Sequence, residues 1–215
     1  MPALKKMNRF SLFLVVVLFS MIGCSKLEDI SAKTEQCSYY SELSSKRPSV
    51  IPDVIKVCTS VIEDKNSNIL DVAVALDARA LVHMSTQNNA DALKDANRAI
   101  ELSGGFYRML STRSSILIAM GEFERSLADL DRIIDQNPTY WIAYSNRGYV
   151  HCKLRNKSLS VSDGVLAARY HPRGYRFFKE ALKSLGYYDG PINDTLDASY
   201  KRAGNKFYED GCPVN

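Results

Sequence analysis

ALKDANRAIELSGG (residues 92–105) and SLADLDRIIDQNPT (residues 126–139) are two versions of one segment, and together they decide the fold. The interval from position 92 to position 126 is the repeat period, and one further period carries Pro138 onto Pro172. Apolar residues recur at helical spacing in both segments, and one helical hairpin cannot bury such a stripe alone. The period therefore predicts helical hairpins stacked side by side. Identical residues occupy four pairs of positions: Leu93 and Leu127, Asp95 and Asp129, Arg98 and Arg132, and Ile100 and Ile134.

The sequence around this period resembles the tetratricopeptide (TPR) repeat, a pair of helices whose pattern recurs at the same interval. MGEFERSLADLDRIIDQNP (residues 120–138) resembles its turn and second helix, with Gly121 at the turn and Pro138 at the stop. YSNRGYVH (residues 144–151) resembles its first helix, with Gly148 in the glycine place. Small residues suit the packing positions of the preceding unit: Ala80, Ala92, Ala96 and Ala99.

The repeat pattern departs from that of the family at both ends of the array. Ser126 stands where the family has Ala, and Ser160 and Gly164 stand where it has Ala and a large residue. Upstream, PDVIKVCTSVIED (residues 52–64) resembles a lone second helix, with proline suited to its first turn. The resemblance implies an all-α fold in which residues 36–172 form a right-handed superhelix of TPR hairpins.

Stacked hairpins of this family curve and leave a concave face lined by first helices. The resemblance therefore implies a groove that binds other envelope proteins. Its expected lining is mixed and weakly polar, and Met84 and Tyr149 are equally well explained as packing residues. The expected groove residues are Asp77, Leu81, Met84, Arg108, Ser111, Ser115, Ser145 and Tyr149.

LGYYDGPIND (residues 185–194) interrupts the helical pattern near the end of the chain. We expect one helix to end at Gly186 and the next to begin only after Asp197. LKSLGYY followed by GPIND resembles the peptidoglycan-binding-like domain of cell-wall proteins, and Ala203 and Phe207 fit its closing helix. The resemblance implies a small helical module over residues 173–215.

This module departs from its family at several loop positions, among them Leu196 where the family has Phe. Exposed tyrosine faces can stack on sugar rings, and carboxylate or amide oxygens can accept hydrogen bonds from sugar hydroxyls. Of the two adjacent rings, we expect Tyr188 to be the exposed one. Three alternatives stay open: a core ring for Tyr187, an Asx turn for Asn193, and a helix pair that only caps the array. The candidate peptidoglycan-binding residues are Tyr187, Tyr188, Asp189, Asn193 and Asp194.

The N-terminus has the layout of a secretory signal, with basic residues before the apolar run FSLFLVVVLFSMIG (residues 10–23). That run is shorter than the roughly 20 residues that span a bilayer as a helix. MIGC (residues 21–24) resembles the lipobox of bacterial lipoproteins, which implies a signal peptide over 1–23 and acylation of Cys24, with palmitate among the chains. By the same resemblance, Ser25 favours the outer membrane facing the periplasm, and residues 24–35 form a linker. An ordinary secreted protein with a spare cysteine is the alternative.

Charge and cysteine usage agree with export. Without residues 1–23 the chain keeps 25 basic and 24 acidic side chains, so it has no basic excess for nucleic acid. Apart from Cys24 the chain has four cysteines, which allow three disulfide connectivities. We expect Cys37 to pair with Cys58 and Cys152 with Cys212, and buried free thiols are the alternative.

The sequence predicts no catalytic activity, no cofactor and no metal site. Its histidines are His83, His151 and His171, and none lies at zinc-ligand spacing with a second ligand. His151 and Cys152 are adjacent, but neighbouring residues of a helix do not face each other. We therefore expect a non-enzymatic protein that holds other molecules at the membrane and the cell wall. The alternative is a pure protein–protein adaptor, or a regulatory subunit of a cell-wall or secretion complex, whose C-terminal helices only cap the array.

Overall fold

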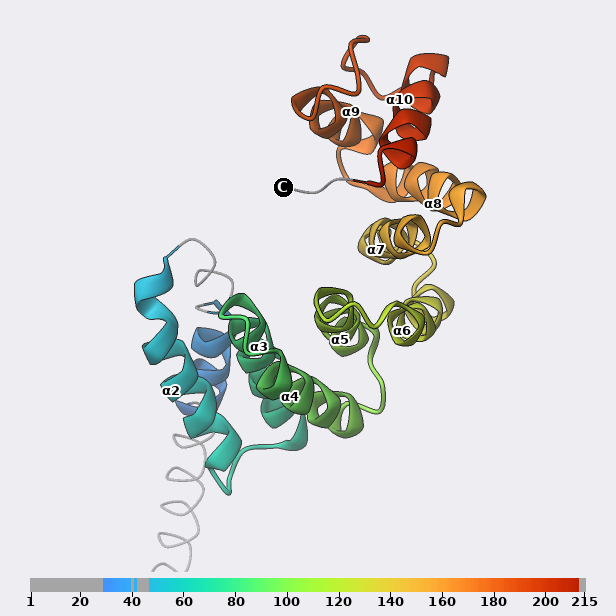
Figure 1. Ribbon diagram of the computed structural model, residues 1–215. Helices are drawn as coiled ribbons and strands as arrows, with labels where there is room; N and C mark the ends of the chain where they lie inside the picture. Colours follow the sequence, from blue (N-terminus) through green and yellow to red (C-terminus); the bar gives the residue numbers. More distant parts are fainter. Residues whose placement is uncertain (1–28, 40, 42–46, 213–215) are drawn as a thin grey trace, which may run out of the picture. The chain divides into compact units, whose positions relative to one another are not determined.

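The computed structural model describes residues 29–39, 41 and 47–212 (Figure 1), and this described part is helical, without a strand. The predicted all-α fold is confirmed. The predicted signal peptide and the lipidation residue Cys24 lie outside the described residues. The chain divides into two compact units, residues 1–103 and 104–215, which we call unit 1 and unit 2.

Unit 1 is a row of antiparallel helices in which α2 packs on α3 and α3 packs on α4. A disulfide between Cys37 and Cys58 joins the first described helix to α2, with Cα atoms 5.2 Å apart, as the sequence predicted. The disulfide lies in an apolar core with Val54 and Val82. The elements are a helix over 29–39, the 3₁₀ turn η1 (Pro48–Val50), α2 (Ile51–Glu63), α3 (Ile69–Ser85) and α4 (Asn89–Leu102).

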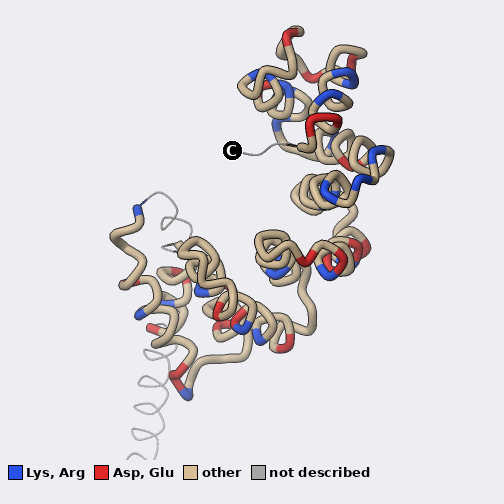
Figure 2. The backbone as a smooth tube through the Cα atoms, viewed as in Figure 1, with Lys and Arg blue, Asp and Glu red and all other residues tan. Residues whose placement is uncertain are grey.

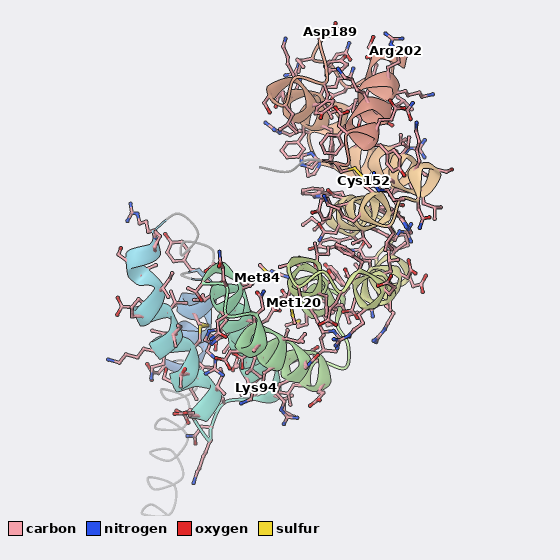
Figure 3. All side chains as sticks on the ribbon, in the orientation of Figure 1. Met84, Lys94, Met120, Cys152, Asp189 and Arg202 are labelled. Atoms are coloured by element: carbon pink, nitrogen blue, oxygen red, sulfur yellow. A yellow bond between two sulfur atoms is a disulfide. The ribbon has the colours of Figure 1, made fainter. Side chains whose placement is uncertain are left out.

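Within unit 2, helices α5 to α8 form a row of antiparallel helices, and α9 and α10 pack on α8 and on each other. The disulfide Cys152–Cys212 ties α7 to the residues after α10, with Cα atoms 6.4 Å apart (Figure 3), and this predicted pairing is also present. The helices expected in 173–215 therefore share a compact unit with α5–α8. The helices are α5 (Tyr107–Ala119), α6 (Phe123–Gln136), α7 (Trp141–Lys153), α8 (Lys157–Tyr170), α9 (Gly174–Ser184) and α10 (Ala198–Glu209).

The repeat period is present in the geometry of the hairpins. Helices α4, α6 and α8 begin at positions 89, 123 and 157, which are successive steps of that period. The turn before each contains one residue with left-handed backbone, at Gln87 (φ 60°), Gly121 (φ 76°) and Arg155 (φ 63°). In each turn the next backbone N–H donates to the carbonyl five residues earlier, at 2.8–2.9 Å. Three successive hairpins thus share one turn conformation.

Small residues bring the two helices of each hairpin close together. Ala80 and Ser114 are fully buried, and Gly148 occupies the corresponding place one repeat later. A Cβ on Gly148 would lie 3.2 Å from both the Asp163 Cβ and the Ser160 carbonyl oxygen. The glycine there is explained by the close approach of α7 and α8.

Candidate functional site

A buried ion pair recurs in the hairpins α3–α4, α5–α6 and α7–α8 and was not foreseen from the sequence. In each pair the arginine of the first helix donates through Nε and Nη2 to both oxygens of an aspartate of the second helix, at 2.6–2.9 Å. The aspartate side chains are only 4–7% exposed. The pairs, each one repeat period after the last, are Arg79–Asp95, Arg113–Asp129 and Arg147–Asp163.

Arg79 and Arg147 also reach the preceding helix. Arg79 Nη1 donates to Thr59 Oγ1 of α2 at 2.9 Å, and Arg147 Nη1 donates to Asp131 Oδ1 of α6 at 2.7 Å. The hydrogen bonds that each arginine donates to its aspartate raise the pKa of the arginine in all three pairs. The sequence did contain a signal for these pairs, because arginine and aspartate both recur at the repeat period. The sequence analysis noted the repeated aspartates of α4 and α6 but not the repeated arginines.

The groove residues predicted in unit 1 lie on α3. Asp77, Leu81 and Met84 are all half-buried, so each is partly accessible and partly packed. The two readings of Met84, contact or packing, both remain compatible with this placement.

The groove residues predicted in unit 2 differ in exposure. Arg108 is exposed at the start of α5, and Ser115 and Tyr149 are half-buried. Ser111 is only 8% exposed, which corrects the expectation that it faces an open groove. Ser115 Oγ donates to the Ser111 carbonyl at 3.0 Å, so the two serines lie one helical turn apart on one face of α5.

The loop between α9 and α10 is fixed by a buried lysine that the sequence did not single out. Lys179 is fully buried, and its Nζ donates to Asn193 Oδ1 at 2.6 Å and to Asp197 Oδ2 at 2.5 Å. Burial lowers the pKa of Lys179, but its hydrogen bonds to Asp197 and Tyr188 outweigh burial and raise the pKa overall. The same lysine lowers the pKa of Asp197, which also caps α10 by accepting from Tyr200 N at 2.7 Å.

The expectation that Tyr188 is the exposed ring of the loop is wrong. Tyr188 is 4% exposed and belongs to an apolar cluster with Tyr200 and Ala203. Its hydroxyl donates to the Pro191 carbonyl at 2.9 Å, so the ring can be buried with its polar end satisfied. Tyr187, which we had considered a possible core ring, is half-buried, with its ring 5.3 Å from that of Phe207.

The other predicted sugar-binding residues divide in the same way. Asn193 Oδ1 also accepts from Thr195 N at 3.3 Å, the Asx turn that was the alternative for this residue. Asp194 Oδ1 accepts from Arg176 N at 3.2 Å near the start of α9. Asp189 is exposed at the outer end of the loop (Figure 3). Asp189 and Asp194 are therefore the exposed members of the predicted set, whereas Tyr187 and Asn193 are half-buried and Tyr188 is buried.

A cavity of about 270 Å³ lies among α7, α8, α9 and α10 of unit 2. Its lining is mostly apolar and includes Tyr149 and Ser145 from the predicted groove. Tyr200 also lines the cavity, and burial raises the pKa of its hydroxyl.

The part of the chain that the structure describes, residues 29–39, 41 and 47–212, offers few other kinds of site. Within them, no helix combines the length and the apolar character needed to cross a membrane, and no three side chains of His, Cys, Asp or Glu gather as metal ligands. Acidic and basic residues are interspersed along the helices of each unit (Figure 2). The Cys152 sulfur is bonded to Cys212, so it is not a thiol nucleophile beside His151.

Comparison of the chain with models of known protein families gives no match, and comparison with curated proteins gives none either. The function proposed below therefore depends on the repeat geometry, the C-terminal loop and the N-terminal motif.

Proposed function

We propose that this chain is a non-enzymatic lipoprotein of the bacterial envelope that acts as a protein-binding scaffold. Cys24 carries the lipid anchor, TPR hairpins over 36–172 bind envelope proteins, and the module over 173–215 touches peptidoglycan. The outer membrane, facing the periplasm, is the proposed location. The observation that carries the proposal is the recurrence, at one period, of turn, helix start and buried Arg–Asp pair, which supports a repeat array.

Site-specific photo-crosslinking in the native host tests the scaffold. Crosslinkers replace Met84 on α3 and Arg108 on α5, and the matched controls replace the exposed Lys94 on α4 and Glu124 on α6. We expect one partner to be captured from the first-helix positions and not from the controls. Capture from all four positions, or from none, contradicts a groove on the first helices.

Intact-mass measurement of the mature chain tests the anchor. We expect the mass to exceed that of the polypeptide from residue 24 by a diacylglycerol and a further acyl chain. The Cys24→Ser chain should lack this increment. An unmodified mass after expression in a competent host contradicts acylation.

A second candidate function is a pure protein–protein adaptor whose C-terminal helices only cap the array. It is favoured by the hydrogen bonds of Asn193, Asp194 and Tyr188, which serve the loop itself. Retention of the whole mature chain on purified sacculi separates the two. Loss of retention in Asp189→Ala, with retention kept in the charge-matched control Asp53→Ala, favours peptidoglycan binding. Absence of retention in the unaltered chain favours the adaptor.

A further inference from the structure

The cavity of unit 2 shares Ser145 and Tyr149 with the predicted groove, but neither function proposed above assigns a ligand to the cavity itself. At about 270 Å³ it is slightly smaller than the ~300–1,000 Å³ of typical small-molecule pockets. Apart from Tyr149, helices α7 and α8 contribute small side chains, while α9 and α10 contribute larger apolar ones, among them Leu182 and Phe207. The walls thus define a compact apolar space inside one compact unit.

Two glycines beside this space are not required by the packing of the helices. A Cβ added to Gly164 of α8 or to Gly204 of α10 would meet no heavy atom within 4 Å. Both residues line the cavity, and glycine within a helix is less stable than alanine. By contrast, Gly148 is explained by close packing, since a Cβ there would lie 3.2 Å from α8. The chain therefore leaves room next to both glycines that its own side chains do not use.

We infer that this cavity binds a single acyl chain whose carboxylate contacts Lys201. Among the lining residues in the described part of the chain, Lys201 is the only charged one, and it is exposed. Its ammonium therefore stands at the rim, where it complements one anionic headgroup.

A hydrocarbon chain suits the walls better than a peptide does. A peptide brings an N–H and a carbonyl with every residue, and burying these groups unpaired is unfavourable. Apart from Lys201, the side-chain polar groups of the lining are the hydroxyls of Ser145, Ser160 and the tyrosines. The hydrocarbon part of an acyl chain has no hydrogen-bonding groups, so its burial leaves no polar group of the ligand unpaired. This inference is independent of the scaffold function, because it uses only contacts inside unit 2.

Titration calorimetry of the purified mature Cys24→Ser chain, which lacks its own acyl groups, tests the apolar part. The probes are straight-chain carboxylates from hexanoate to tetradecanoate, below their micelle concentrations. Each buried methylene strengthens binding about fourfold, so the affinity should rise stepwise and level off when the cavity is full. Absence of binding overturns the proposal, and so does a rise without a plateau, which is the behaviour of surface adsorption.

Filling the cavity gives the structural control. Gly164→Leu and Gly204→Leu should each weaken dodecanoate binding at least tenfold while the helical circular dichroism and the unfolding temperature are retained. Ser199→Leu, on α10 but outside the lining, should bind as the unaltered chain does. Unchanged binding in both glycine variants places the ligand elsewhere and overturns the proposal.

The headgroup is tested by changing ligand and residue together. Lys201→Ala should weaken dodecanoate binding about two- to fivefold, the range of an exposed ion pair, and leave dodecanol binding unchanged. Lys183→Ala, an exposed lysine of α9 outside the lining, should change neither. Equal losses for acid and alcohol contradict the headgroup contact. A peptide with an apolar C-terminus that binds more tightly than dodecanoate, and is lost in Gly164→Leu, would assign the cavity to a peptide instead.

Discussion

Replacing Asp163 by asparagine tests whether the repeated ion pairs stabilise the hairpins. Asp163 accepts from Arg147 at 2.9 and 2.8 Å, and its side chain is 5% exposed. Removing one partner of a fully buried pair costs about 3–5 kcal/mol. Arg147 is 22% exposed and keeps its contact with Asp131, so we expect about 2 kcal/mol. That loss lowers the unfolding temperature by about 4–8 °C.

Thermal and urea unfolding of the soluble Cys24→Ser chain, followed by circular dichroism, measures the effect. The control is Glu209→Gln, because the Glu209–Lys157 pair is 2.9 Å long but its side chains are 63% and 45% exposed. A pair of that exposure contributes less than about 1 kcal/mol. If the two units unfold in separate transitions, Asp95→Asn identifies the transition of unit 1, because it should shift that transition and not the one shifted by Asp163→Asn.

A loss for Asp163→Asn no larger than that of Glu209→Gln refutes the reasoning. If the loss is larger, the double variant Arg147→Met with Asp163→Leu separates two causes of the instability. If the single variant is unstable because it leaves Arg147 without its carboxylate, the apolar pair should recover most of the loss. If the pair itself provides the stability, the double variant remains as unstable as the single one.

Three further predictions concern single residues of unit 2. Gly148→Ala should lower the unfolding temperature, because the added Cβ would lie 3.2 Å from atoms of α8. Gly164→Ala has open space around the added Cβ, so it should raise the free energy of unfolding by ~0.5–1 kcal/mol. Equal shifts of the unfolding temperature in the two variants contradict this explanation. Arg155→Gly should raise the free energy of unfolding in urea by about 1 kcal/mol, because φ at this residue is 63°, and a loss contradicts it. Lys179 lowers the pKa of Asp197, so the contribution of this carboxylate is present above the ordinary pKa of 3.8 and is lost as the pH falls through the lowered value. When unfolding is measured at several acidic pH values, the difference in stability between the unaltered chain and the Asp197→Asn chain should become smaller as the pH falls through the lowered pKa. A difference that stays constant contradicts the contact between Lys179 and an ionised Asp197.

The helices and their limits were largely predictable because they depend on local pattern. The α9 helix ends where Gly186 adopts φ 79°, and α10 begins at Ala198, directly after Asp197, as the spacing of glycine and apolar residues indicated. Ala92, Ala96 and Ala99 are fully buried, in agreement with their expected role in close helix contact. Periodicity carries this information because each helix buries one face.

The arrangement of the loop between α9 and α10 was less predictable, because it depends on contacts between residues that are far apart in the sequence. Tyr187 and Tyr188 are adjacent and chemically identical, so composition does not show which ring the loop buries. The choice depends on Lys179, whose Nζ reaches Asp197 across 18 positions and lies 5.4 Å from the Tyr188 ring centroid. A lysine in a helical pattern is ordinarily read as solvated, and only the assembled loop supplies the acceptors that permit its burial.

The repeated ion pairs explain how a row of small residues can hold a defined register. Ala80, Ser114 and Gly148 let paired helices approach closely, but small side chains resist sliding along the helix axis weakly. A bidentate arginine–carboxylate contact is directional, because both N–H groups must meet both oxygens. Its recurrence in the hairpins α3–α4, α5–α6 and α7–α8 gives these three hairpins the same offset between their helices. We therefore regard register, rather than net stability, as the main contribution of these pairs, and the Arg147→Met, Asp163→Leu variant tests this directly: it should remain folded but lose the sharpness of its unfolding transition.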